Sequence, residues 1–449
     1  MCTYGLEQWA QSQSSFFYVN SWVTNVATAG VLLWSLAVRQ SQGVSPLAGG
    51  FPKVFWAVVA LFAWSAFSLA WTIMPEEAWS NWRGQSPYLI ASIVIMPLLV
   101  RDLEDLKTAF PMTLLLGGVV LLLIVTTTRW EGRQIILSQG AAIGSVKGKY
   151  GSPLATASLA GWVSLIALLM NYRGAGRLWQ LLRWPLIGLG LIIAFRSGSR
   201  GQLFAMCAAG LVFLPFSRRI RNIWGFVGAA LGVALLLTLA TLTFDYFAWG
   251  NRGGRWDADN MINTWQGSRL EMSMTLLRAW ADAGPVAWLI GLGTSAAFDP
   301  NLCGFYPHLV MLEVLGELGL VGFALLWTAT VLAFWSYARV HDRVKEDPVK
   351  RGLAAAMGAL FLFEVILSFK QGSLLGSSFA FGYAVILGRL WASTARTPAS
   401  VEAGAGGWPA GYEVGWAVSA PASPAGGAFG EARPGGAEYV APFEGRGGY

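Results

Sequence analysis

The chain has 449 residues, of which 55% are hydrophobic and only 12% are charged, whereas soluble domains carry roughly 25% charged residues. This composition excludes an ordinary soluble enzyme and indicates a membrane protein. The net charge of +7 does not indicate a nucleic-acid partner, because no basic strip interleaved with aromatic residues occurs. The three cysteines are too few and too scattered for a disulfide scaffold or a zinc site.

Apolar blocks long enough to cross a hydrocarbon core of roughly 30 Å recur along the chain. Helices are expected there, because backbone polar groups find no water in a bilayer. We predict about eleven membrane-spanning helices, with twelve as the alternative count. They lie near residues 16–38, 53–74, 86–100, 108–128, 153–170, 179–196, 201–216, 223–245, 308–336, 353–369 and 374–392.

Lysine and arginine gather in alternate connections, as expected of cytoplasmic loops. The strongest clusters, Ser217–Arg221 and Arg339–Arg351, predict an outer N-terminus and a cytoplasmic C-terminus. The membrane domain then comprises residues 1–394. Within it, residues 246–307 form one large outer loop. Residues 395–449 are rich in Gly, Ala and Pro, which predicts a disordered cytoplasmic tail. The predicted outer connections nevertheless contain several lysines and arginines, which membrane orientation alone does not explain. These cations indicate an anionic ligand on the outer face.

The first outer segment with candidate chemistry is residues 195–202, a polar turn between two predicted spans. It puts Arg196 and Arg200 at the membrane boundary beside Gly201, which lets a backbone or a ligand approach closely. A guanidinium fork matches two phosphate oxygens at once. The alternative is a pair of interfacial arginines that extend to water.

The large outer loop supplies Arg269, a helical stretch with Arg278, and the short apolar run Pro285–Leu292, which ends in Gly291-Leu-Gly293. That run is too short to span, so we expect an interfacial or re-entrant element. Taken alone, Arg269 would be interpreted as a solvated loop charge. The pair Asp257 and Asp259 has a spacing that some nucleotide-sugar transferases use for a metal. Nucleotide sugars are cytoplasmic, however, and we expect no metal.

The third segment runs from Tyr306 to Gly322 and opens the next span. His308 is one of two histidines, and an imidazole pKa of roughly 6.5 suits a general base. A structural interfacial histidine is the alternative. Glu313 and Glu317 share one face of the expected helix. A carboxylate at membrane depth is costly enough to indicate a functional site.

In this order, the three segments resemble the O-antigen ligase and polymerase family of bacterial envelope glycosyltransferases. The family shows Ser-Arg-Gly between two spans, an arginine before Gly-x-Gly in a large periplasmic loop, and Pro-His-Asn-x-x-Leu-Glu followed by Glu-x-Gly-x-x-Gly. The matching residues are Ser199-Arg200-Gly201, Arg269, Gly291-Leu-Gly293, Pro307-His308-Leu309, Leu312-Glu313, Glu317, Gly319 and Gly322. Leu309 replaces the usual asparagine, and an upstream Asn-Pro-Asn element is reduced to Gly151-Ser-Pro-Leu-Ala155.

The resemblance covers roughly residues 145–330. It implies an all-α polytopic membrane protein of the membrane glycosyltransferase (GT-C type) architecture, in the bacterial inner membrane, with a periplasmic active site. A glycan would pass en bloc from undecaprenyl diphosphate to a hydroxyl acceptor, without cofactor or metal. His308 would accept the hydroxyl proton, and Arg200 and Arg269 would bind and stabilise the diphosphate. Further substrate-binding candidates are Arg196, Arg278, Glu313 and Glu317.

Within the family, the resemblance favours a polysaccharide polymerase, of O-antigen or exopolysaccharide, over a ligase. The motif Tyr-Pro-His, with the Leu-Glu and Glu-Leu-Gly that follow, is more similar to polymerases than to ligases. The alternative is an O-antigen ligase that attaches glycan to the lipid A core. A more distant alternative is a transporter or flippase of the same lipid, although transporters often show inverted repeats and none is evident. Expected partners are the lipid-linked donor, a glycan or lipid A core acceptor, membrane lipids and a chain-length regulator, with no nucleic acid.

Overall fold

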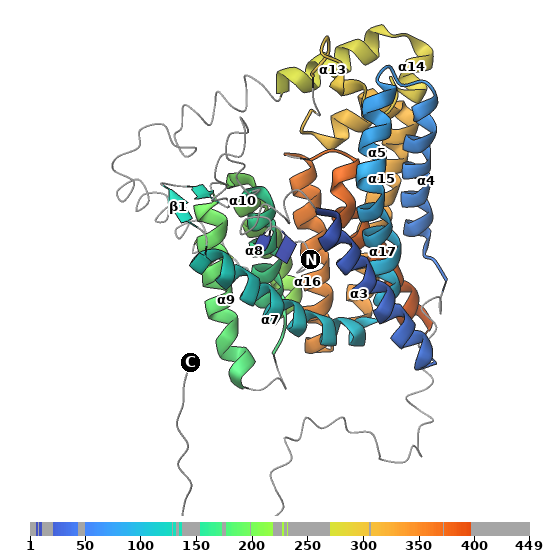
Figure 1. Ribbon diagram of the computed structural model, residues 1–449. Helices are drawn as coiled ribbons and strands as arrows, with labels where there is room; N and C mark the ends of the chain where they lie inside the picture. Colours follow the sequence, from blue (N-terminus) through green and yellow to red (C-terminus); the bar gives the residue numbers. More distant parts are fainter. Residues whose placement is uncertain are drawn as a thin grey trace, which may run out of the picture. The chain divides into compact units, whose positions relative to one another are not determined.

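The computed structural model describes residues 6–7, 9–10, 21–43, 50–127, 129–131, 134–136, 153–172, 177–197, 199–218, 227–228, 231, 270–304, 307–370 and 372–396. The chain divides into two units, Met1–Thr397 and Pro398–Tyr449. All described residues lie in the first unit (Figure 1). Most of the predicted span 223–245, most of the predicted tail and residues 246–269 of the predicted loop fall outside the described residues.

The described residues are almost entirely helical. In chain order the helices are α3 (Ser21–Ser41), α4 (Lys53–Phe67), η1 (Ser68–Ala70), α5 (Pro75–Leu89), the π-helical η2 (Ile90–Ile95), α6 (Met96–Leu99), α7 (Leu103–Thr127), α8 (Pro153–Leu169), α9 (Arg177–Arg196), α10 (Arg200–Arg218), α13 (Leu270–Asp282), α14 (Pro285–Ile290), η4 (Ala296–Phe298), α15 (Val310–Val344), α16 (Pro348–Ser368), η5 (Leu375–Ser377) and α17 (Ser378–Arg396). Strands β1 (Arg129–Glu131) and β2 (Gln134–Ile136) form a small antiparallel pair.

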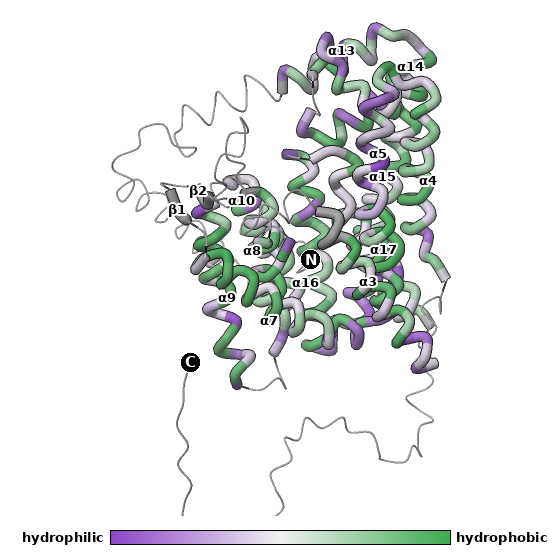
Figure 2. The backbone as a smooth tube through the Cα atoms, viewed as in Figure 1, coloured by the Kyte–Doolittle hydropathy of each residue, from purple (hydrophilic) through white to green (hydrophobic). Residues whose placement is uncertain are grey.

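Within the described part of the chain, seven helices are long and apolar enough to cross a membrane. They are α4 extended through η1, α7, α9, α10, α15, α16, and α17 with η5. Large apolar side chains remain exposed along them, such as Ile192 on α9 and Val331 on α15. Figure 2 shows hydrophobic residues along α9 and hydrophilic ones at one of its ends. Such surfaces are stable in lipid rather than water. The prediction of a multi-pass, helical membrane protein is confirmed at this level.

The predicted span 86–100 is part of a longer helical stretch that begins at Pro75. The apolar block marks only its second half, because the first turns carry Glu76 and Glu77. Proline at the first helical position and acidic residues in the first turn both favour a helix start there. The helix therefore begins well before the predicted span.

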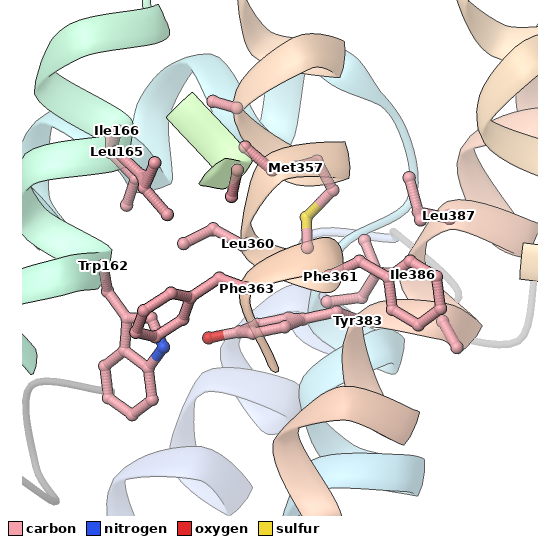
Figure 3. Close-up of a cluster of buried hydrophobic side chains, with 14 of the residues drawn as sticks. Trp162, Leu165, Ile166, Met357, Leu360, Phe361, Phe363, Tyr383, Ile386 and Leu387 are labelled. Carbon is pink, nitrogen blue, oxygen red and sulfur yellow. The ribbon is translucent and has the colours of Figure 1, made fainter. Parts of the chain in front are cut away.

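Helices α8, α10, α15 and α17 pack around α16, whose first half is rich in alanine and glycine. Small residues let membrane helices approach closely. Gly161 of α8 faces the ring of Phe363, and Gly358 faces the rings of Phe213 and Tyr337. Figure 3 shows this core, in which Trp162, Phe363 and Tyr383 lie close together. The small residues therefore let α16 pack closely against α8, α10 and α15.

Helices α10 and α16 run antiparallel and touch at both ends. At one end the Lys370 Nζ donates to Gln202 Oε1 over 3.2 Å; at the other the Arg351 Nε donates to the Ser217 carbonyl over 3.2 Å. We call these the Lys370 end and the Arg351 end. Lys350, beside Arg351, lies 3.8 Å from Glu104 at the start of α7. The same pair of helices therefore builds a polar region at each end of the bundle.

Candidate functional site

His308 lies in the turn that leads into α15. Its backbone is left-handed, with φ 62°, which is uncommon for residues other than glycine although histidine is enriched there. The buried Ser273 of α13 donates its Oγ to the Pro307 carbonyl over 3.1 Å, so α13 holds the backbone just before the histidine. Backbone strain of this kind clusters at functional sites. The backbone from which the half-buried imidazole projects is therefore anchored to α13.

Cys303 lies near this turn, where its Sγ donates to the Met272 carbonyl over 3.1 Å. Burial raises the pKa of the Cys303 thiol. A nucleophilic cysteine needs a lowered pKa, so Cys303 serves to attach the loop to α13.

A break in α15 at Gly319 receives the segment that follows α14. Gly319 has φ 66° and ψ −166°, so the carbonyls of Gly316 and Glu317 are released from regular helical bonding. They accept instead the N–H groups of Leu292, over 3.0 Å, and Gly293, over 2.8 Å. The Gly-x-Gly element and the Glu-x-Gly element of the sequence thus contact each other directly.

The Glu317 side chain is 4% exposed and completes this contact. One carboxylate oxygen accepts the Ser295 N–H over 2.7 Å and the other accepts the Ala297 N–H over 3.1 Å. Asn81 of α5 also bonds the Ser295 hydroxyl, over 3.1 Å. A typical hydrogen bond within a protein contributes roughly 0.5–1.5 kcal/mol to stability. This geometry favours a positioning role for Glu317 over the predicted contact with substrate.

Gly319→Ala is expected to destabilise the protein by about 3 kcal/mol, from backbone strain and overpacking. A Cβ there would meet the Leu289 carbonyl, which is backbone and cannot move aside. Gly188→Ala on α9 is the matched control, because nothing lies within 4 Å of a Cβ at that site. Thermal unfolding of the detergent-solubilised variants measures the difference. Equal unfolding temperatures for the two would contradict the proposed clash.

Glu313 lies one helical turn before Glu317 and is 6% exposed. Its Oε1 accepts the N–H of Leu374 over 3.0 Å, in the connection between α16 and α17. Its Oε2 is buried and has no hydrogen-bond partner among the described residues. A buried acceptor without a partner costs roughly 1–3 kcal/mol, and such groups often mark a ligand position. The open oxygen fits the predicted contact between Glu313 and substrate.

The turn between α9 and α10 is held by its serines. Ser197 Oγ donates to the Ala194 carbonyl over 2.7 Å and accepts the Ser199 N–H over 3.2 Å. Arg200 is the first residue of α10, and its side chain is outside the described part of the structure. At the next residue, Gly201, a Cβ would meet the end of the Lys370 side chain, which would have to shift.

Lys370 was not a predicted site residue, although it is a cation in a predicted outer connection. Its ammonium reaches Gln202 on α10, while the same connection, through Leu374, reaches Glu313 on α15. The α16–α17 connection therefore joins the Ser-Arg-Gly turn to the segment that begins with His308. At Gly201 the sequence predicts the close approach of a backbone or a ligand. The structure places the Lys370 side chain there.

The other predicted site residues are not gathered into this cluster by the described contacts. Arg196 is the last residue of α9 and is exposed. Arg278 is exposed on α13, almost opposite Leu276, which packs against Gly316. Arg269 lies just before α13, outside the described residues, as do Asp257 and Asp259.

Glu364 is a further acidic group that the sequence reasoning missed. It lies in α16, one turn before the helix ends, and its Oε1 accepts the Trp162 Nε1–H over 2.7 Å. The sequence alone could have identified Glu364, because it lies within the predicted span 353–369 and a carboxylate at membrane depth indicates a functional site by default.

The α16–α17 connection thus places an ammonium group and a carboxylate with an open oxygen at the Lys370 end. The half-buried His308 lies shortly before that carboxylate in the chain, in the turn that opens α15. These groups can take up a proton, orient hydroxyls and attract an anion. A scan of the chain against protein-family models and a search of curated proteins found no match.

Proposed function

We propose that the protein is a membrane glycosyltransferase of the O-antigen ligase and polymerase type, which transfers a glycan en bloc from undecaprenyl diphosphate to a hydroxyl acceptor. The observation that carries this proposal is the α16–α17 connection, which contacts both the Ser-Arg-Gly turn and Glu313. The contact between Gly291-Leu-Gly293 and Glu317 supports it further. Separate pieces of the sequence resemblance are thereby neighbours in one region.

In the proposed reaction the acceptor oxygen bonds to the anomeric carbon, and the bond from that carbon to the diphosphate oxygen breaks. His308 takes the acceptor proton as general base. Arg200 and Arg269 stabilise the negative charge on the departing lipid diphosphate. Lys370 adds positive charge at the start of α10, and the open oxygen of Glu313 accepts a hydrogen bond from a glycan hydroxyl. No cofactor or metal is assigned a role.

The membrane orientation in this proposal follows from the distribution of cations. Arg39 and Arg101 both pair with Asp105, at 3.0 and 3.2 Å, near the start of α7 and on the side of Lys350. Cations at this end fit a cytoplasmic face, which leaves the His308 turn on the periplasmic face of the inner membrane. The proposal keeps about eleven spans, with twelve as the alternative, and the periplasmic loop 246–307.

The test uses purified protein in lipid nanodiscs with an undecaprenyl-diphosphate oligosaccharide and a chelator. We expect release of undecaprenyl diphosphate together with a longer lipid-linked glycan, as a polymerase would produce. Transfer only to added lipid A core would instead identify the ligase alternative within the same class.

Two outcomes would contradict the glycosyltransferase proposal itself. One is movement of the intact donor across the membrane without release of diphosphate, which is the reaction of a flippase. The other is transfer that requires metal and is lost in Asp257→Asn with Asp259→Asn, while His308→Asn remains active.

A further inference from the structure

The Arg351 end of the bundle contains a polar cavity that the glycan-transfer site does not use. Its volume is about 270 Å³, just below the usual range of roughly 300–1,000 Å³ for ligand pockets. It lies where α8 ends, α9 begins, α10 ends and α16 begins. Its polar lining consists of Asn171, Ser217 and the arginines Arg183, Arg218 and Arg351.

Among the described residues, no acidic side chain lines the cavity or forms an ion pair with these arginines. The sequence has no Asp or Glu between Glu131 and Asp245, so α8, α9, α10 and their connections carry none. The nearest carboxylate along the chain from Arg351 is Asp347, which instead accepts the N–H groups of Val349 and Lys350 at the start of α16. Among the described residues the three arginines have no ion pair. The cavity therefore carries uncompensated positive charge.

Neighbouring groups contact the guanidinium groups of Arg351 and Arg183. Arg351 is 8% exposed and donates to the carbonyls of Ser217, over 3.2 Å, and Lys345, over 2.6 Å. Arg183 stacks 4.6 Å from the centre of the Trp184 ring. Its Nε is buried without a hydrogen-bond partner in the part of the chain that the structure describes. An arginine that serves only to set membrane topology extends its guanidinium group to water. The Arg183 Nε is instead buried away from water.

We propose that this cavity binds a phosphate group, held by Arg183, Arg218 and Arg351. Planar guanidinium forks match phosphate oxygens in pairs, and a phosphate would satisfy the buried Nε of Arg183. The group can belong to an anionic lipid headgroup or to free phosphate. Basic pockets between helices near the cytoplasmic surface bind anionic headgroups, and the exposed Trp184 beside the cavity is typical of the interfacial region. This proposal is independent of glycan transfer.

Native mass spectrometry of the full chain in detergent tests the proposal, with phosphatidylglycerol or inorganic phosphate added in separate arms. Arg183→Gln should weaken the bound species about tenfold or more, the effect of losing one charge-assisted hydrogen bond. Arg339→Gln is the matched control, because Arg339 also stacks on a tryptophan, 5.2 Å from Trp335, but lies outside the cavity lining.

Retention of phosphatidylglycerol that phosphate cannot displace would identify a lipid headgroup, and specific phosphate binding without lipid would identify the free ion. Failure of the wild-type chain to bind either one, or equal weakening by Arg339→Gln, would overturn the proposal. If Arg183→Gln does not fold, the exposed Arg218 gives a second variant, Arg218→Gln, with the same expected loss. Thermal unfolding without ligand separates lost binding from lost structure.

Discussion

His308→Asn is expected to slow glycan transfer by roughly 10²–10⁴-fold while leaving donor binding intact. Imidazole can take the acceptor proton near neutral pH, and an amide cannot. Asparagine is preferable to alanine here because it tolerates the left-handed backbone that His308 adopts. The difference in rate between His308→Asn and the wild-type protein then reports the loss of the imidazole rather than a disturbed turn. Single-turnover transfer and a separate donor-binding measurement distinguish the two effects.

The other histidine provides the matched control. His341 lies at the opposite end of α15 and stacks on Tyr337, with ring centroids 5.9 Å apart. His341→Asn removes an imidazole from the same helix without touching the candidate site, so transfer should continue at nearly the original rate. Similar loss of transfer in the two variants, or unchanged transfer in His308→Asn, would argue against a general base at His308.

Arg200→Ala and Arg269→Ala are expected to slow transfer by about 10²–10³-fold, the usual effect of removing a donor that stabilises developing charge. Unlike His308→Asn, they should also weaken donor binding, because part of the diphosphate charge is left unmatched. Lysine at either position should restore activity only in part, since a point charge replaces a planar fork. Donor titrations on the purified variants separate the loss of binding from the loss of rate.

Arg278→Ala tests for general electrostatic effects, because the described contacts leave this predicted substrate-binding residue outside the Lys370 end. Arg278 is exposed on the face of α13 almost opposite Leu276, so its removal changes the charge of the same loop without removing a group from the cluster. A loss of donor binding as large as that of Arg269→Ala would show that the loop acts through its total charge. The assigned role of Arg269 would then be incorrect.

Much of the local structure could be predicted from the sequence because it depends on near neighbours. Apolar blocks give the long helices such as α7, α9 and α16, since a helix satisfies its own backbone in lipid. The helical stretch around Arg278 was also predictable, and it forms α13. The start of the helix at Pro75 was missed because its first turns are polar and lie outside any apolar block.

The candidate site was predictable only as separate pieces. Both His308 and Glu313 stand out by residue type at the expected start of a span. That Glu317 would bond two backbone N–H groups was not predictable, because Ser295 and Ala297 lie in a different segment. Nor could the sequence distinguish the roles of the two glutamates, which share one helix face.

By itself, the sequence determined that the chain is a helical membrane protein with its cations in alternate connections. Composition and helical period decide this, and both are properties of short stretches. Only the tertiary structure decided that Lys370 lies against Gly201, that Gly319 breaks α15 to receive Gly293, and that Arg183 and Arg351 meet in one cavity. Each of these depends on contacts between helices far apart in the chain. Such contacts are set by side-chain packing across the whole bundle, which no local pattern records.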